Sequence, residues 1–258
     1  MRNRIGCWVM MVGLMCFMST VCVGKKVVNS EQLDWNQKLI EVAEHGDGEL
    51  GRILIGYGAD VNWKNETGAS ALFRAVEGGH LDFVKLLAAH GANLNLLGKE
   101  DESVLMVAAM MGHGEIVRYL LGQGIRVNQK NICGETALSL AVRGGHAEIV
   151  QMLLDKQALV NVTDNTRMTP LMEAATQGHS DILRLLLSHK AKVNMLDIDK
   201  RSALMKAVIR GHEEIVVILI KAGADMKVKD ADGRTCLNWA RWMGQTQIAR
   251  LLMKAGAK

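Results

Sequence analysis

The chain has 258 residues, of which 49% are hydrophobic, 4% are aromatic and one is proline. This composition is typical of a protein built mostly of helices. The formal net charge is only +4, so the charge gives no indication of nucleic-acid binding, which requires a strongly basic face.

The N-terminal segment, 1–24, differs from the rest of the chain. Arg2 and Arg4 precede a run at 5–23 that carries no charge. A basic start followed by an apolar run that ends in small residues is typical of a secretory signal peptide, so we expect cleavage after Gly24. An uncleaved membrane anchor is the alternative, because a helix of this length nearly spans a bilayer. The mature protein is expected to be secreted or periplasmic, with membrane contact only if residues 5–23 remain.

After a short linker, expected at 25–33, the chain repeats one pattern without an insertion, and the repeating unit is about 33 residues long. Its histidine column contains His80, His113, His146, His179 and His212. A leucine column obeys the same period at Leu39, Leu72, Leu105, Leu138, Leu171, Leu204 and Leu237. The period predicts seven repeats, at 34–66, 67–99, 100–132, 133–165, 166–198, 199–231 and 232–258.

Each repeat carries two short apolar stripes with helical spacing. Those of the fourth repeat are Leu138, Ala141 and Val142, then Ile149, Val150 and Leu153. Gly145 lies between the stripes and can adopt the left-handed conformation that ends a helix. One helical hairpin cannot bury its apolar face alone, but stacked hairpins can. We therefore expect an all-α solenoid whose first and last repeats act as caps.

The repeat resembles that of the ankyrin family in three pieces of sequence. These are "TPLMEA" at 169–174, "GHLDFVKLLAAHGANLN" at 79–95 and "GADVN" at 58–62. The resemblance covers residues 34–258 and implies an ankyrin-repeat solenoid of stacked helix-turn-helix units with β-turn or hairpin connections. Gln157 and Lys190 depart from the family pattern, because they stand where a glycine normally ends the second helix.

The stretch "GDGELG" at 46–51 has the G-x-G-x-x-G spacing of a dinucleotide-binding loop. In register with the other repeats, however, Gly46 ends a helix and Asp47 takes the histidine column. The preceding segment has a helical pattern, so the strand that such a loop requires is missing. We expect no nucleotide or other cofactor.

The histidine column does not predict a metal site, because packed helices lie about 8–10 Å apart whereas zinc ligands lie about 2 Å from the metal. We interpret these histidines as polar caps at helix starts. Cys133 and Cys236 lie about 30 Å apart by the same spacing, so we expect two separate free thiols. No catalytic motif is recognisable, and we expect no enzymatic activity.

The resemblance also implies where a partner binds. In ankyrin-like proteins the partner usually meets the hairpin tips and the exposed side of each first helix, which together form a concave groove. The candidate tip residues are Glu66, Glu100, Glu102, Ile132, Glu135, Met168, Ile198, Arg201 and Arg234. The candidates on first helices are Glu77, Met110, Met111, Arg143, Gln177, Ile209, Arg210, Trp242 and Met243.

Two features of this set are not required by the fold. An exposed apolar band, which usually marks an interaction site, is expected from Met110, Met111, Ile132, Met168, Ile198, Ile209, Trp242 and Met243. Acidic residues gather at the N-terminal end of the groove and arginines at the C-terminal end. A partner segment with basic and acidic ends and an apolar middle is complementary to this arrangement.

We therefore expect a monomeric, non-catalytic scaffold that binds another protein in the groove. One alternative is a structural spacer or assembly subunit tethered to a membrane by residues 5–23. A further alternative is an enzyme whose site has no recognisable motif.

Overall fold

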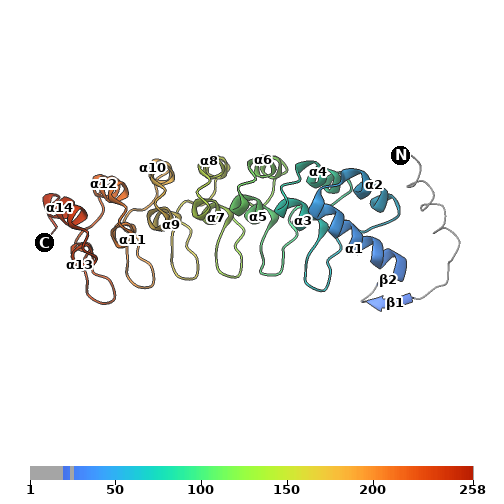
Figure 1. Cartoon of the computed structure of the whole chain (residues 1–258), viewed down its shortest axis with the longest axis horizontal. Coiled ribbons are helices and arrows are strands. Elements are labelled where there is room, and N and C mark those ends of the chain that lie inside the picture. The colour runs from blue at the N-terminus through green and yellow to red at the C-terminus, as the bar shows by residue number, and fades with distance from the viewer. Residues whose placement is uncertain (1–19, 24–25, 258) are drawn as a thin grey trace, which may run out of the picture.

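The computed structural model describes residues 20–23 and 26–257. Its helices form antiparallel pairs that stack in a single elongated row, with α1 and α2 at one end of the row and α13 and α14 at the other (Figure 1). The first helices are α1 (Ser30–His45), α3 (Ala71–Glu77), α5 (Val104–Met111), α7 (Ala137–Arg143), α9 (Pro170–Gln177), α11 (Ala203–Arg210) and α13 (Cys236–Trp242). The second helices are α2 (Gly48–Gly56), α4 (Leu81–Ala89), α6 (Gly114–Gly122), α8 (Ala147–Asp155), α10 (Ser180–Ser188), α12 (Glu213–Lys221) and α14 (Thr246–Lys254). The predicted all-α solenoid is confirmed.

A small antiparallel sheet precedes the solenoid. It pairs β1 (Thr20–Val23) with β2 (Lys26–Asn29). The segment expected to be a linker, 25–33, therefore holds β2 and the first turn of α1, which has 16 residues. Most of the expected signal peptide lies outside the described residues. Among the residues that are described, no helix has both the length and the hydropathy needed to cross a bilayer.

A serine or threonine begins each first helix after α1. The Oγ1 of Thr136 accepts a hydrogen bond from the backbone N–H of Ser139, at 3.4 Å, and Ser103 does the same for Met106, at 3.2 Å. Each bond satisfies one of the N–H groups that a helix leaves unpaired at its start. A glycine follows most of these helices, such as Gly112, whose φ of +79° reverses the chain toward the second helix.

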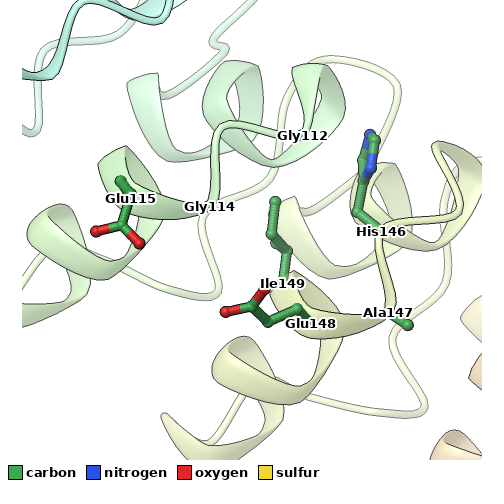
Figure 2. A pocket seen from close by; sticks show the side chains of 7 residues that line it. All are labelled: Gly112, Gly114, Glu115, His146, Ala147, Glu148 and Ile149. Carbon is green, nitrogen blue, oxygen red and sulfur yellow. The ribbon is translucent and has the colours of Figure 1, made fainter.

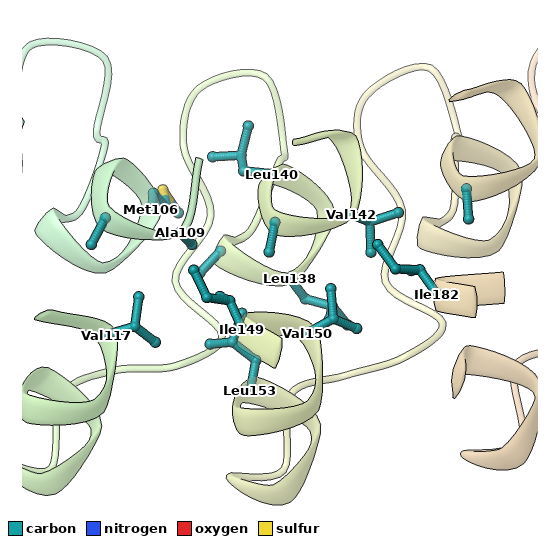
Figure 3. Close-up of a cluster of buried hydrophobic side chains, with 14 of the residues drawn as sticks. Met106, Ala109, Val117, Leu138, Leu140, Val142, Ile149, Val150, Leu153 and Ile182 are labelled. Atoms are coloured by element: carbon teal, nitrogen blue, oxygen red, sulfur yellow. The ribbon is translucent and has the colours of Figure 1, made fainter. Parts of the chain in front are cut away.

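The core runs as one continuous layer between the helices of each pair and between neighbouring pairs (Figure 3). Every member of the predicted leucine column is buried, with at most 2% of its surface exposed. Leu138 from α7 meets Val150 and Leu153 from α8, and Met106 approaches from the preceding α5. The apolar stripes of one hairpin are therefore buried by its neighbours, as a stacked array requires.

The histidine column joins neighbouring units, and the prediction that it caps the second helices is wrong. None of these histidines makes a side-chain capping bond to its own helix. Instead, the Nε2 of His146 donates to the carbonyl oxygen of Met110, at 3.1 Å, at the end of the preceding first helix. That carbonyl is one of the groups that a helix end leaves unpaired. The side chain of Asp47 does cap its helix, with Oδ1 accepting from the N–H of Leu50 at 3.0 Å, so "GDGELG" is a helix start.

An asparagine column forms a second link between units. The Oδ1 of Asn128 accepts from the backbone N–H of Leu159 at 2.9 Å, and its Nδ2 donates to the carbonyl oxygen of Gln157 at 3.2 Å. Asn62, Asn161 and Asn194 make the same pair of bonds. Each unit therefore fixes the turn of the next one, which sets the spacing of the stack.

Candidate partner-binding face

Between each second helix and the next first helix, the chain extends as a long loop. The last eight residues of the loop before each serine or threonine cap are here called a finger, and the fingers are 62–69, 95–102, 128–135, 161–168, 194–201 and 227–234. The fingers lie on one side of the first helices and the second helices lie on the other (Figure 1). An aspartate or asparagine closes every finger except the second, where Gly98 holds the position. Oδ1 of Asp164, for example, accepts from the N–H groups of Thr166 and Met168, both at 2.8 Å. Such local bonds favour a tight turn. We call the surface formed by the fingers and the exposed sides of the first helices the finger face.

Backbone hydrogen bonds join neighbouring fingers. The N–H of Ile132 donates to the carbonyl oxygen of Glu100, and that of Ile198 donates to Thr166, each at 3.0 Å. The predicted tip residues Ile132 and Ile198 therefore stand on finger ends held in place by the preceding finger. Because these finger ends are already ordered, binding of a protein to them would not require separate loops to become ordered.

Six of the eight apolar candidates are exposed. The exposed residues are Met110, Met111, Ile132, Ile198, Trp242 and Met243. Met168 and Ile209 instead pack partly against the core, so they add less apolar surface than expected. Trp242 is 67% exposed and Ile198 is 59% exposed, so both offer a large apolar surface on the finger face.

The acidic candidates gather around Glu102 in the N-terminal half of the finger face. Partial burial raises the pKa of Glu102, and repulsion from Glu100, Glu135 and Glu77 raises it further. Because each of these carboxylates disfavours ionisation of Glu102, they lie close enough to act on one another. Glu77 and Glu135 are paired with Arg74 and Arg143, so the negative charge of the cluster that has no ion-pair partner among the described residues comes from Glu100 and Glu102. Glu66 is a further exposed acid on the same side of the stack.

A network that the sequence did not predict crosses the middle of the face. Arg143 pairs with Glu135 at 2.5 Å and with Glu173 at 3.3 Å. The Nε2 of Gln177 donates to the same Glu173 oxygen at 2.9 Å. Glu173 is buried in α9, so it holds two predicted site residues, Arg143 and Gln177, in fixed positions. Arg143 is thereby neutralised and does not act as a free positive charge.

The C-terminal end of the face combines arginine with tryptophan. The guanidinium groups of Arg201 and Arg234 lie over the ring of Trp239, at 5.4 and 5.1 Å, and Arg234 also lies 5.4 Å from Trp242. The ring N–H of Trp239 donates to Oδ2 of the buried Asp230 at 2.7 Å. Cation–π contacts of this kind fix long arginine side chains near a ring. Arg210 is exposed on α11, nearer the middle of the face.

Hydrogen bonds determine the charge of Asp230. Burial alone raises the pKa of this carboxyl, but bonds from the backbone of Arg234, the ring of Trp239 and the backbone of Asp232 lower it further than burial raises it. The pKa of Asp230 therefore lies below its ordinary value, and the residue is a stable anion at neutral pH. Asp230 therefore holds the ring of Trp239 and the backbone of the last finger in place, and the ring of Trp239 contacts the exposed Trp242.

The sequence analysis missed one column of this face. Glu173 and Trp239 belong to it, and so does Lys206, whose Nζ lies 2.6 Å from the buried Asp197. In the six units after the first, the members of this column are Arg74, Val107, Leu140, Glu173, Lys206 and Trp239. The residue type in this column changes from unit to unit, whereas the neighbouring columns repeat the same residue type. That variation in the sequence is the signal that could have identified the column as part of the finger face.

A shallow pocket of about 390 Å³ lies between the third and fourth units, lined mainly by residues of α6 and α8 and the turns before them (Figure 2). It contains His146, Glu115 and Glu148. The Nε2 of His146 already binds Met110, and Glu148 pairs with Arg118 at 2.7 Å. Both side chains are therefore engaged in holding the units together. Within the described residues, no three histidine, cysteine or acidic side chains form a candidate metal site.

The two cysteines of the solenoid are free thiols, as predicted. Cys133 is exposed on a finger, whereas Cys236 is buried at the start of α13. Burial raises the pKa of the Cys236 thiol to about 11. Cys236 is therefore a protonated core side chain at neutral pH and does not have the character of a reactive nucleophile.

Comparison with known proteins identifies the repeat. A family model described as ankyrin repeats, in three copies, matches residues 39–131, 124–197 and 191–258. These matches extend through every helix pair of the stack, from α1 to α14. A search of curated protein sequences found no match.

Proposed function

This chain belongs to the ankyrin-repeat family, and from that premise we propose that it is a non-catalytic scaffold that binds a partner protein on the finger face. Ankyrin repeats generally act in protein–protein interaction. The observation that carries the proposal is the exposure of Met111 and Ile198, at 51% and 59%, on a surface where solvent favours polar side chains. Methionine also adapts its shape to a partner.

The charges of the finger face support a partner of particular chemistry. The cluster around Glu102 favours a basic segment, and Arg234 beside Trp242 favours an acidic or aromatic one. Exposed Met110, Met111 and Ile198 favour an apolar stretch between these two. We propose a partner segment that carries these three kinds of residue in this order.

The test compares capture of a partner by three forms of the full chain. Met111→Glu combined with Ile198→Glu places two charges on the finger face, whereas Leu159→Glu places one on an equally exposed leucine that is not among the finger-face candidates. We expect the wild type and Leu159→Glu to bind the purified partner with equal affinity. The double variant is expected to lose at least about tenfold, because a buried charge opposes the interface. Equal binding by all three forms contradicts the proposal.

Residues 5–23 support export as the proposed route to the site of action, because a basic start and an apolar run are typical of a signal peptide. A membrane-tethered spacer is the second proposal and rests on the same residues. The intact mass of the protein from its source separates them. Loss of residues 1–24 supports export and excludes the tether, and their retention supports the tether.

A further inference from the structure

The first unit leaves apolar side chains uncovered at the N-terminal end of the stack. In α2, Leu50, Ile53 and Tyr57 are 41%, 47% and 52% exposed. Leu50 occupies the position in its repeat that Phe83 occupies in the next one. Phe83 is 1% exposed, and its ring packs on Gly51 of the preceding second helix, where an added Cβ atom would lie 2.6 Å from the ring. In the part of the chain that the structure describes, no helical unit precedes the one that carries Leu50. The face that every later unit buries therefore stays open here.

The last unit leaves a matching surface at the other end. Met253 in α14 is 45% exposed. Its counterparts Leu121 and Leu154 are only 8% and 7% exposed, and its counterparts Leu187 and Ile220 are half-buried. All four lie in second helices that contact the second helix after them. A following unit therefore covers much of this position where one exists. Both ends of the stack present side chains of the type that internal junctions bury.

Ion pairs across internal junctions show what a further junction would contain. Two arginines bind the acidic residue in the first turn of the next second helix: Arg118 with Glu148 at 2.7 Å, and Arg184 with Glu214 at 3.0 Å. In each pair the acidic residue follows the arginine by 30 positions. The last member of the arginine column is Arg250, and the first member of the acidic column is Glu49. Among the residues that the structure describes, neither has a neighbouring unit that completes the pair.

The two ends carry opposite charge. Residues 34–58 contain five acidic and two basic residues, whereas residues 236–257 contain three basic residues and no acidic one. An N-terminal end is therefore attracted to a C-terminal end and repelled by a second N-terminal end. Charge complementarity selects one arrangement of two copies over the other.

We propose that copies of this chain associate head to tail, with α2 of one copy stacking on α14 of another so that the repeat register continues across the junction. Leu50 and Ile53 then cover Ala249 and Met253, and Glu49 pairs with Arg250. A contact between two different surfaces of the same chain can be repeated from copy to copy, so it generates assemblies larger than a dimer. The finger face stays free in such an assembly, and the proposal differs from the expectation of a monomer.

Sedimentation velocity of the full chain tests this arrangement with one variant at each end. We expect the wild type to grow in mass with concentration beyond a dimer. Ile53→Glu blocks one end and Met253→Glu blocks the other, so each variant alone should sediment as a monomer. An equal mixture should form a dimer and nothing larger, because only one intact end of each kind remains. The control Leu159→Glu should associate like the wild type.

Three results would overturn the proposal. A wild type that stays monomeric at every soluble concentration shows that nothing stacks on the open ends. Association that survives Met253→Glu but not Ile53→Glu indicates contact between two N-terminal ends. Association that persists in a chain carrying both substitutions places the contact elsewhere, and residues 5–23 then become the candidate.

A charge exchange tests the ion pair separately. Glu49→Arg or Arg250→Glu alone should weaken association, with a further loss at low salt where like charges repel most strongly. A chain carrying both changes restores the pair with reversed charges, so its association should return to within about threefold of the wild type. Failure of this rescue, with both single variants impaired, contradicts the proposed register.

Discussion

His113 donates its Nε2 hydrogen to the backbone carbonyl of Glu77, 36 residues earlier in the chain and 3.1 Å away. The ring reaches that carbonyl because Gly79 has no side chain: a Cβ atom there would lie 2.9 Å from the ring. The same bond recurs at His80, His146 and His212. In these four repeats the histidine therefore links its unit to the preceding one.

We predict that His113→Ala lowers the free energy of unfolding by about 1–2 kcal/mol, because it leaves a helix-end carbonyl without its partner. Chemical denaturation followed by circular dichroism measures the change. His90 is exposed, and His90→Ala serves as the control, with an expected change within about 0.5 kcal/mol. Equal effects at both positions would show that the interunit bond adds nothing.

Gln157 adopts a left-handed conformation, with φ of +61°, where most other units have glycine. Such a conformation strains a residue that carries a Cβ atom. We predict that Gln157→Gly raises the free energy of unfolding by about 0.5–1 kcal/mol, although glycine usually destabilises. Gln123 ends α6 with φ of −91°, so Gln123→Gly should destabilise in the same denaturation experiment.

The carboxylate cluster predicts a pH dependence with a definite sign. Because the pKa of Glu102 is raised in the folded protein, the ionised side chain opposes folding above that pKa, and the cost disappears as the pH falls through it. Glu102→Gln should therefore stabilise the protein at pH 7.5 and have little effect near pH 4. Denaturation at the two pH values measures this. Stabilisation that is equal at both pH values would contradict the electrostatic account.

Substitutions of the two tryptophans of α13 should separate an effect on stability from an effect on partner binding. Trp239 is 6% exposed and Trp242 is 67% exposed. Trp239→Ala is expected to cost about 3–5 kcal/mol of unfolding free energy, since it empties the core and removes the donor to Asp230. Trp242→Ala should leave stability within about 1 kcal/mol but weaken partner binding at least tenfold, as exposed aromatic anchors do. Loss of stability without loss of binding in Trp242→Ala would assign that ring to the core.

Sequence alone predicted the repeat, the helices and the core, because each is local or recurs in every unit. The leucine column is buried throughout, since the same environment surrounds it in every unit. The histidine partners were not predictable, because the acceptor lies in the preceding unit and only the stacking brings the two together.

The finger face was predictable only in part. The repeat register predicted which residues lie at the finger tips and on the first helices, and six of the eight apolar candidates among them are exposed. Glu173 was missed because its role depends on Arg143 of the preceding unit, which meets it only in the folded stack. Met168 and Ile209 were placed on the exposed band, but their side chains pack against the core, where apolar surface is more stable than in water.

Site-specific photo-cross-linking in the source cells tests the central claim most directly. A photoreactive residue replaces Ile198 on the finger face or, in a separate chain, the equally exposed Leu159. A scaffold that binds through the finger face predicts that Ile198 gives a discrete cross-link to one partner protein, and that Leu159 does not. Cross-links of equal yield from both positions, or a partner captured from Leu159 alone, would contradict it.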